Sequence, residues 1–187
     1  VSADLGGIYA DDGNLSITDC GEISVTSTNW YSIEAYGDIC ISGCARIFSS
    51  ARHDPIWADG SVSVSDCGKV TISTKKIETN DISDGIKADK GNVTIRDCGE
   101  VTISAENDGI EATGDVSISN CSKVTVSADD NGIYADRDVI IKDCISDSGK
   151  KVSIQAGMSG IYANRGVSIS NCSEVEVSIR EQSKDNR

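Results

Sequence analysis

Short runs of alternating apolar and polar residues fill most of the chain, and turn residues separate these runs. In the stretch 85–107, GIKADKGNVTIRDCGEVTISAEN, three such runs follow one another and begin at Ile86, Val93 and Val101. Alternation with a period of two over a few residues is typical of strands that bury one face. No stretch places apolar residues at helical spacing. We therefore expect short strands and no helices.

The same unit recurs along the chain with a basic period of about 23 residues. Its first strand starts with an Ile-x-Ala motif at Ile8, Ile33, Ile56, Ile86, Ile110, Ile133 and Ile161. A cysteine follows the second strand at Cys20, Cys44, Cys67, Cys98, Cys121, Cys144 and Cys172. A fixed period of this size indicates stacked repeats. With three short strands per repeat, the sequence predicts an all-β fold, a right-handed parallel β-helix of about seven coils.

We expect one solenoid domain over residues 1–179 and a polar tail over residues 180–187. Stacking of neighbouring coils stabilises such folds. The chain begins within a repeat, so we expect it to belong to a longer solenoid, and the absence of a secretory signal says little about its location. Two insertions interrupt the repeat, at 73–83 and 145–151. They are either functional loops on a rigid scaffold or ordinary insertion drift.

The chain has eight cysteines, and seven of them occupy the inward column after the second strand. In-register neighbours on adjacent coils have Cβ atoms roughly 4.8 Å apart, whereas a disulfide requires about 3.8 Å. We therefore predict an inward ladder of reduced, buried thiols that pack as small hydrophobic groups. Cys40 stands at an outward position and is expected to be a surface thiol.

The formal net charge of −13 argues against a nucleic-acid partner, because nucleic acid binds to basic surfaces. No run of about 18 apolar residues exists, so we expect no membrane span.

Acidic and amide side chains form a column at the entry to the first strand. Asp84, Asp108 and Asn131 each precede a glycine, and Asn107 and Asp130 stand just upstream. Stacked carboxylates must protonate, spread apart or recruit a cation. Hard oxygen ligands suit Ca²⁺, which takes 6–8 of them. The alternative is ordinary Asx–Gly turn chemistry without an ion.

The outward residue of the Ile-x-Ala strand forms a second column. Its members are Tyr9, Glu34, Trp57, Lys87, Glu111, Tyr134 and Tyr162. Four of the eight aromatic residues fall here, and Trp30 flanks the same strand. Sugar rings stack on exposed aromatic rings while charged groups bond their hydroxyls. The predicted carbohydrate-binding residues are Tyr9, Trp30, Trp57, Lys87, Glu111, Tyr134 and Tyr162. The alternative is a solvated face with aromatics that favour strands.

The phrase at residues 108–119, DGIEATGDVSIS, resembles the repeats of a known family. Calcium-binding, carbohydrate-binding β-helix domains of secreted clostridial and ruminococcal proteins carry repeats similar to D-G-I-x-A-x-G-x-V-x-I-x-G-G. They are related in fold to pectate-lyase-like polysaccharide lyases. The resemblance spans residues 7–179. In this chain a cysteine replaces the second glycine after the second strand, which alters a core column and is also compatible with another branch, such as a gut bacterial surface protein.

This resemblance implies Ca²⁺ at the turn formed by Asp84, Asn107, Asp108, Asp130 and Asn131. It also implies binding of plant cell-wall chains that are cellulose-like or pectin-like, and an extracellular or cell-surface location.

Three functions follow, in order of preference. The first is a non-catalytic extracellular polysaccharide-binding module that depends on Ca²⁺. The second is a structural or adhesive cell-surface spacer whose open coil ends stack end to end. The third is a polysaccharide lyase with Lys87 as its base. His53 beside Asp54 is weak support for a base, and short loops leave little room for a deep cleft.

Overall fold

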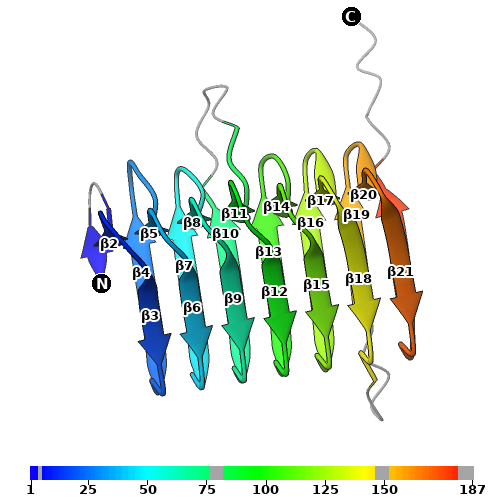
Figure 1. Ribbon diagram of the computed structural model, residues 1–187, viewed down its shortest axis with the longest axis horizontal. Helices are drawn as coiled ribbons and strands as arrows, with labels where there is room; N and C mark the ends of the chain where they lie inside the picture. Colours follow the sequence, from blue (N-terminus) through cyan, green and yellow to red (C-terminus); the bar gives the residue numbers. More distant parts are fainter. Residues whose placement is uncertain (4–5, 76–81, 146–151, 181–187) are drawn as a thin grey trace, which may run out of the picture.

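The computed structural model describes residues 1–3, 6–75, 82–145 and 152–180. Its coils follow one another along a rod, with the two chain ends at opposite ends (Figure 1). Most of the two predicted insertions, 73–83 and 145–151, and of the predicted tail, 180–187, lies outside the described residues. The described part contains 22 strands, and their pairing places them in three sheets.

Each coil contributes one strand to each sheet, and every pairing between neighbouring coils is parallel. The first-strand sheet contains β2 (Ile8–Ala10), β5 (Ile33–Ala35), β8 (Ile56–Ala58), β11 (Ile86–Ala88), β14 (Ile110–Ala112), β17 (Asn131–Ala135) and β20 (Ser159–Ala163). The second-strand sheet contains β3 (Leu15–Thr18), β6 (Ile39–Ser42), β9 (Val62–Ser65), β12 (Val93–Arg96), β15 (Val116–Ser119), β18 (Asp138–Lys142) and β21 (Gly166–Ser170). The third-strand sheet contains β1 (Ser2–Ala3), β4 (Glu22–Ser27), β7 (Arg46–Ala51), β10 (Lys69–Thr74), β13 (Glu100–Ala105), β16 (Lys123–Ala128), β19 (Val152–Ala156) and β22 (Val175–Ile179). The predicted all-β parallel solenoid of about seven coils is confirmed, and its right-handed turn stays a prediction.

The core lies inside the rod and is filled by the inward positions of the three sheets. In β11, Ile86 and Ala88 are buried while Lys87 faces outward, as the alternation predicts. In the last coil, the inward-position side chains of Val167 and Val177 are 50% and 46% exposed, because no further described coil covers them. Burial of each coil's apolar side chains therefore depends on its neighbours.

All eight cysteines are free; Cys40 is exposed, as predicted. Each of the seven at the inward position donates its thiol hydrogen to the carbonyl two residues earlier, for example Cys67 to Ser65 at 3.1 Å. Burial raises the pKa of the Cys144 thiol to about 11, so this group stays protonated near neutrality. The continuous ladder of sulfurs stays a prediction.

The corner before each cysteine uses the left-handed backbone region, which Asn and Asp tolerate better than most residues. Six of these corners have φ between 50° and 56°, at Asp19, Asp66, Asp97, Asn120, Asp143 and Asn171. Side chains at these corners also bond across coils, as Asn120 Nδ2 donates to Asp97 Oδ1 at 2.6 Å. The left-handed geometry explains why this column carries Asx residues.

One glycine column brings neighbouring coils close together at the entry to the first strand. A Cβ added to Gly109 would overlap Cγ1 of Val126 and lie 2.5 Å from the carbonyl oxygen of Gly132. Only glycine fits such an approach without a shift of the backbone. The acidic side chain just before it, Asp108, is thereby held close to the next coil.

Opposite charges pair between coils on the third-strand sheet. Glu100 accepts ion pairs from Lys69 and Lys123, each at 3.1 Å. These are exposed pairs, worth well under about 1 kcal/mol each, and they support the register rather than bind a ligand.

Candidate functional site

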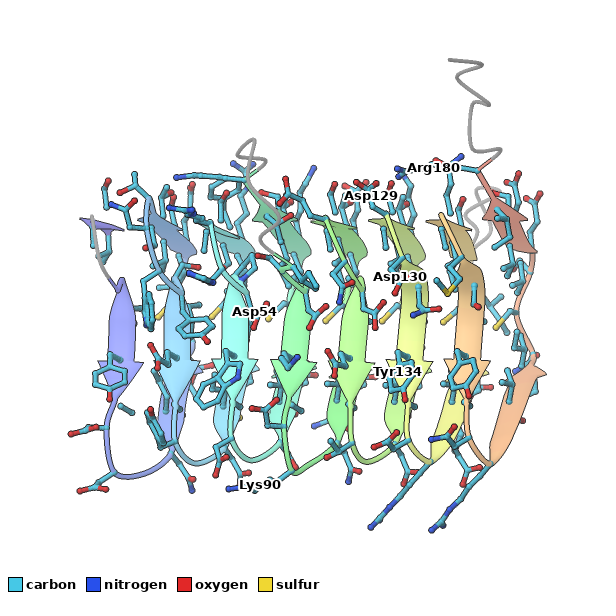
Figure 2. All side chains as sticks on the ribbon, turned by 90° about the horizontal axis from the view of Figure 1, so that it is seen from above. Asp54, Lys90, Asp129, Asp130, Tyr134 and Arg180 are labelled. Carbon is cyan, nitrogen blue, oxygen red and sulfur yellow. The ribbon has the colours of Figure 1, made fainter. Side chains whose placement is uncertain are left out.

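The outward column of the first-strand sheet is aligned as the repeat predicts. The register pairs Tyr9 with Glu34, Glu34 with Trp57, Trp57 with Lys87, Lys87 with Glu111, Glu111 with Tyr134, and Tyr134 with Tyr162. Figure 2 looks onto this face, with Tyr134 on the sheet, Asp54 and Asp130 toward one edge, and Lys90 at the other edge. We refer to this surface as the first-strand face.

Aromatic side chains from three coils contact one another at one end of this face. We call this group the aromatic cluster; it consists of Tyr9, Trp30, Tyr31, Tyr36, His53 and Trp57. Tyr36 lies edge-on to Tyr9 and to Trp57, with ring centroids 6.2 Å and 5.4 Å apart. Tyr31 stacks on Trp57 at 5.6 Å.

Trp30 completes the cluster from the loop before β5. Its ring lies 5.3 Å from Tyr31 and 5.0 Å from His53, both edge-on. The sequence predicted Tyr9, Trp30 and Trp57 as binding residues but did not include Tyr31, Tyr36 or His53 among them. His53, which the sequence raised as a weak candidate base, packs as a member of this cluster.

A cavity of about 400 Å³ opens at the cluster and is lined by Gly6, Tyr9, Trp30, Glu34 and Tyr36. Glu34 occupies an outward position, yet its exposed fraction is only 7%. Burial raises the pKa of the Glu34 carboxyl, and a hydrogen bond involving Trp30 opposes this rise. A polar side chain is thus held beneath aromatic rings at the floor of an open cavity.

Two further tyrosines stack on the opposite half of the face. The rings of Tyr134 and Tyr162 are 5.1 Å apart and almost parallel, with an angle of 3° between their planes. The Tyr134 hydroxyl donates to Asp136 Oδ1 at 3.1 Å. The aromatic members of the predicted carbohydrate-binding set therefore form two groups on this face.

Charged residues occupy the centre of the face, between the two aromatic groups. The Lys87 ammonium lies 3.0 Å from Asp84 Oδ2 and 2.7 Å from Glu111 Oε2. One oxygen from each of Asp84, Asp108 and Glu111 lies within 4.8 Å of the others. We call the group formed by Asp84, Lys87, Asp108 and Glu111 the acidic centre. Its members come from the predicted metal set and from the predicted carbohydrate set, so the two predictions meet at one place.

A row of hydrogen bonds fixes the aspartates beside the acidic centre. Asp54 Oδ1 accepts from the backbone N–H of Asp84 at 2.7 Å, and Asp84 Oδ1 accepts from the N–H of Asp108 at 2.9 Å. Asp108 Oδ1 then accepts from the N–H of Asn131 at 2.8 Å. We call this row the aspartate ladder. The entry turns of the fourth, fifth and sixth coils are thus each held by a carboxylate of the coil before.

The sequence predicted Asp84 and Asp108 for this row but not Asp54. In the third coil Pro55 stands where five of the seven coils carry glycine, so the Asp–Gly signal is missing. The alignment of Asp54 three residues before Trp57, as Asp84 is before Lys87, was the signal that could have found it.

Ionisation of the acidic centre is strongly shaped by burial. Burial and the neighbouring Asp84 raise the pKa of Glu111 to about 8. Burial also raises the pKa of Asp108 to about 6 and that of Asp54 to about 7. Asp84 differs, because the bond with Glu111 and the charge of Lys87 outweigh burial and lower its pKa. Asp84 is therefore the carboxylate that carries the charge here.

Lys87 has the wrong electrostatic setting for a general base. Burial would lower its pKa, but the charges of Asp84 and Glu111 raise it above the usual range. A base must release its proton near neutral pH. Lys87 instead stays protonated as the counter-ion of Asp84 and also contacts the carboxyl group of Glu111.

A divalent cation would find hard oxygen ligands in Asp84, Asp108 and Glu111, which suit Ca²⁺. The fit requires the Lys87 ammonium to move, because it already contacts two of these groups. Two other predicted ligands face the centre with amide nitrogens: Asn107 Nδ2 donates to Asp84, and Asn131 Nδ2 donates to Asp108. Asp130 contacts Asn131 at 3.4 Å and lies outside the three-carboxylate group. Ca²⁺ binding stays a prediction.

Within the described residues, no helix has the length and apolar character needed to cross a membrane. The comparison with curated proteins found no match, and neither did the comparison with solved structures. The family model named carbohydrate-binding domain-containing protein matches residues 3–178, nearly the full length. With the exposed aromatic cluster on one face, this match agrees with the carbohydrate-binding function expected from the sequence. The chain belongs to the family of carbohydrate-binding domain-containing proteins.

Proposed function

We propose that this protein is a non-catalytic, extracellular module that binds a polysaccharide on its first-strand face. The observation that carries the proposal is the aromatic cluster, which stands outside a core that is filled by aliphatic side chains and cysteines. The exposed fractions of Tyr9, Trp30 and Tyr36 are 52%, 45% and 53%. Leaving so much apolar area in water is unfavourable, because burial of that area would stabilise the fold. Exposed aromatic groups of this size mark binding sites.

The arrangement of the face favours a polymer that lies along the rod. The aromatic cluster and the Tyr134–Tyr162 pair lie on the two halves of one flat sheet, with the acidic centre between them. Sugar rings at either end would contact aromatic groups, while hydroxyls near the middle would donate to carboxylates. A cellulose-like or pectin-like chain of the plant cell wall has this extended form.

Ca²⁺ would bind at the acidic centre, where Asp84, Asp108 and Glu111 provide its oxygen ligands. A bound cation would offset the repulsion between carboxylates and supply a positive charge for acidic sugars. The non-catalytic assignment is supported by the protonated state of Lys87, the lyase base that the sequence suggested.

Affinity gel electrophoresis tests the proposal. The protein is run through gels that contain single polysaccharides, with Ca²⁺ and again with EDTA. Retardation by one polymer is expected, and its loss in EDTA would support the Ca²⁺ dependence. Retardation that persists in EDTA would rule out the Ca²⁺ dependence and leave the aromatic face as the binding surface. Mobility that no polymer changes would refute polysaccharide binding.

A spacer or adhesive role is the second candidate, and one observation favours it. The inward-position side chains Val167, Ile169 and Val177 of the last coil are 41–50% exposed. A second rod stacked on this end would cover them and pair the open strand edges. Sedimentation velocity over a range of protein concentrations tests this idea, because a stacking rod must form larger species as concentration rises.

A further inference from the structure

Glu34 stands out among the charged residues of the first-strand face because it is buried and forms no ion pair within the described residues. Its exposed fraction is 7%, whereas Glu111, its counterpart in the fifth coil, faces the ammonium of Lys87. The neighbours of Glu34 in its column are Tyr9 and Trp57. A hydrogen bond with the Trp30 side chain favours its charged form, and the negative charge of Asp11 opposes it.

The surroundings of the cavity have a negative potential. Burial and then the charges of Asp54, Glu34 and Asp89 raise the pKa of Tyr31, a member of the aromatic cluster, to about 12. The column contains one cation, Lys87, and two carboxylates already hold it. The whole chain carries a formal charge of −13. A ligand with a positive charge would therefore be drawn to this face, and one with a negative charge would be repelled.

Aromatic rings arranged around a carboxylate are suited to an organic ammonium group. A cation gains from the negative faces of Tyr and Trp rings, by about 2 kcal/mol or more where water is excluded. An ion pair with a buried carboxylate adds to this gain, since a buried charge is costly without a partner. Tyr9, Trp30 and Tyr36 line the cavity around Glu34, so both contributions are available at one place.

We propose that this cavity binds the protonated amino group of a 2-amino sugar, so that the module selects polysaccharides built from unacetylated amino sugars. The inference rests on the proposed carbohydrate-binding function and specifies the charge of the sugar bound at the aromatic cluster. Glu34 forms the ion pair, and the three rings contact the sugar and its ammonium. A neutral sugar, as in a cellulose-like chain, binds here through the rings alone. The uronates of a pectin-like chain would bind at the acidic centre, where Ca²⁺ supplies a positive charge, rather than at this cavity.

Two oligosaccharides that share one backbone and differ in whether their amino groups are free or acetylated provide the test. Glucosamine hexamer and its fully N-acetylated counterpart share one backbone, but only the first carries amines that are protonated at about pH 6. Isothermal titration at physiological salt, where the screening length is about 8 Å, suppresses long-range attraction between charges. The protein is expected to bind the amino form at least about tenfold more tightly.

Two matched variants test whether the preference for the amino form depends on Glu34. Glu34→Gln should reduce the ratio of the two affinities from about ten to about one. Glu22→Gln removes the same charge from the third-strand sheet and should leave that ratio unchanged. Thermal melts followed by circular dichroism verify that both variants fold. If Glu34→Gln does not fold, the unaltered chain still gives a test, because the preference must disappear as the amines lose their protons above about pH 8.

Equal affinity for the two hexamers would overturn the proposal. An equal loss of preference in both variants would do so as well, since it would show attraction to the overall charge rather than to Glu34. If neutral polysaccharides bind and the amino form binds no better, the carbohydrate-binding function stands and only this inference fails. If nothing binds, both fail together.

Discussion

The Lys87 ammonium lies 2.7 Å from Glu111 in the next coil, and this contact holds together the centre of the first-strand face. The same nitrogen bonds Asp84, so one cation is shared between carboxylates of two coils. Asp108 is the third carboxylate of the group. The centre therefore holds one cation among three carboxyl groups.

Replacement of Lys87 by methionine should destabilise the fold at neutral pH. The change leaves the charged Asp84 without its counter-ion, and loss of one partner from a buried pair costs about 3–5 kcal/mol. Lys87 keeps 26% of its side chain exposed, so we expect a smaller loss of about 1–3 kcal/mol. Urea unfolding at neutral pH measures it. Lys69→Met, which breaks an exposed pair with Glu100, is the control and should cost under about 1 kcal/mol. Equal losses in the two variants would contradict the prediction.

Stability should depend on pH through Asp54. Its pKa rises from 3.8 in the ordinary state to about 7 in the fold, because the buried carboxyl is costly to ionise. Between these values the folded chain holds a proton that the unfolded chain has lost, so this contribution to stability falls as pH rises from about 4 to about 7. Asp54→Asn cannot ionise and should become more stable relative to the parent as the pH increases, by about 1–3 kcal/mol at pH 8.

Glu100 provides a control of opposite sign for this pH experiment. The hydrogen bond from Lys123 and the charge of Lys69 lower its pKa below 4.5. Its contribution is present above its ordinary pKa and is lost as the pH falls through the folded value. Glu100→Gln should thus become less stable relative to the parent as the pH rises. Urea midpoints measured at pH values between about 3 and 8 follow both variants, and curves of the same sign would disprove the assignment.

Polysaccharide affinity should depend on Trp30. The ring is 45% exposed and lines the cavity, so Trp30→Ala removes a binding surface with modest effect on the core. We expect affinity for the retained polymer to fall by about tenfold or more, the effect of losing an anchor aromatic. Affinity electrophoresis at several polymer concentrations gives the dissociation constants. Phe48→Ala removes an exposed ring from the third-strand sheet and should leave binding unchanged.

Ca²⁺ should raise the melting temperature if it binds at the acidic centre, because a ligand that binds only the folded state stabilises it. The shift should increase in Lys87→Met, which frees the oxygens that the ammonium now contacts. It should decrease in Asp108→Asn, which removes one carboxylate of the group. Differential scanning fluorimetry with and without EDTA records these shifts. A shift that is the same in all three proteins would place the cation elsewhere.

The repeat made much of the fold predictable from the sequence. Each Ile-x-Ala motif forms a strand of the first-strand sheet, and Tyr9, Trp57 and Lys87 share one column as the period requires. Alternation determines which side of a strand a residue faces, and the fixed period determines its neighbours in adjacent coils. Both properties can be read directly from spacing.

The details of the site depend on side-chain directions that no period specifies. Glu34 occupies an outward position, but the rings of Trp30 and Tyr36, from segments on either side of β5, leave it only 7% exposed. Asp54 joins the aspartate ladder although Pro55 replaces the usual glycine. Both residues lie in the second and third coils, where the sequence departs most from its own repeat.

The contacts of Arg180 affect how the last coils of the rod unfold. Its guanidinium group bonds Asp129 at 2.6 Å and also contacts Ser127, so it reaches from the end of β22 across β19 to the end of β16 (Figure 2). The terminal coil of a solenoid normally frays first, and its amide hydrogens then exchange with solvent before those of the coil beneath it. This tether joins the last strand to one two coils away. Amides of β19 and β22 should therefore exchange at similar rates, as one cooperative unit.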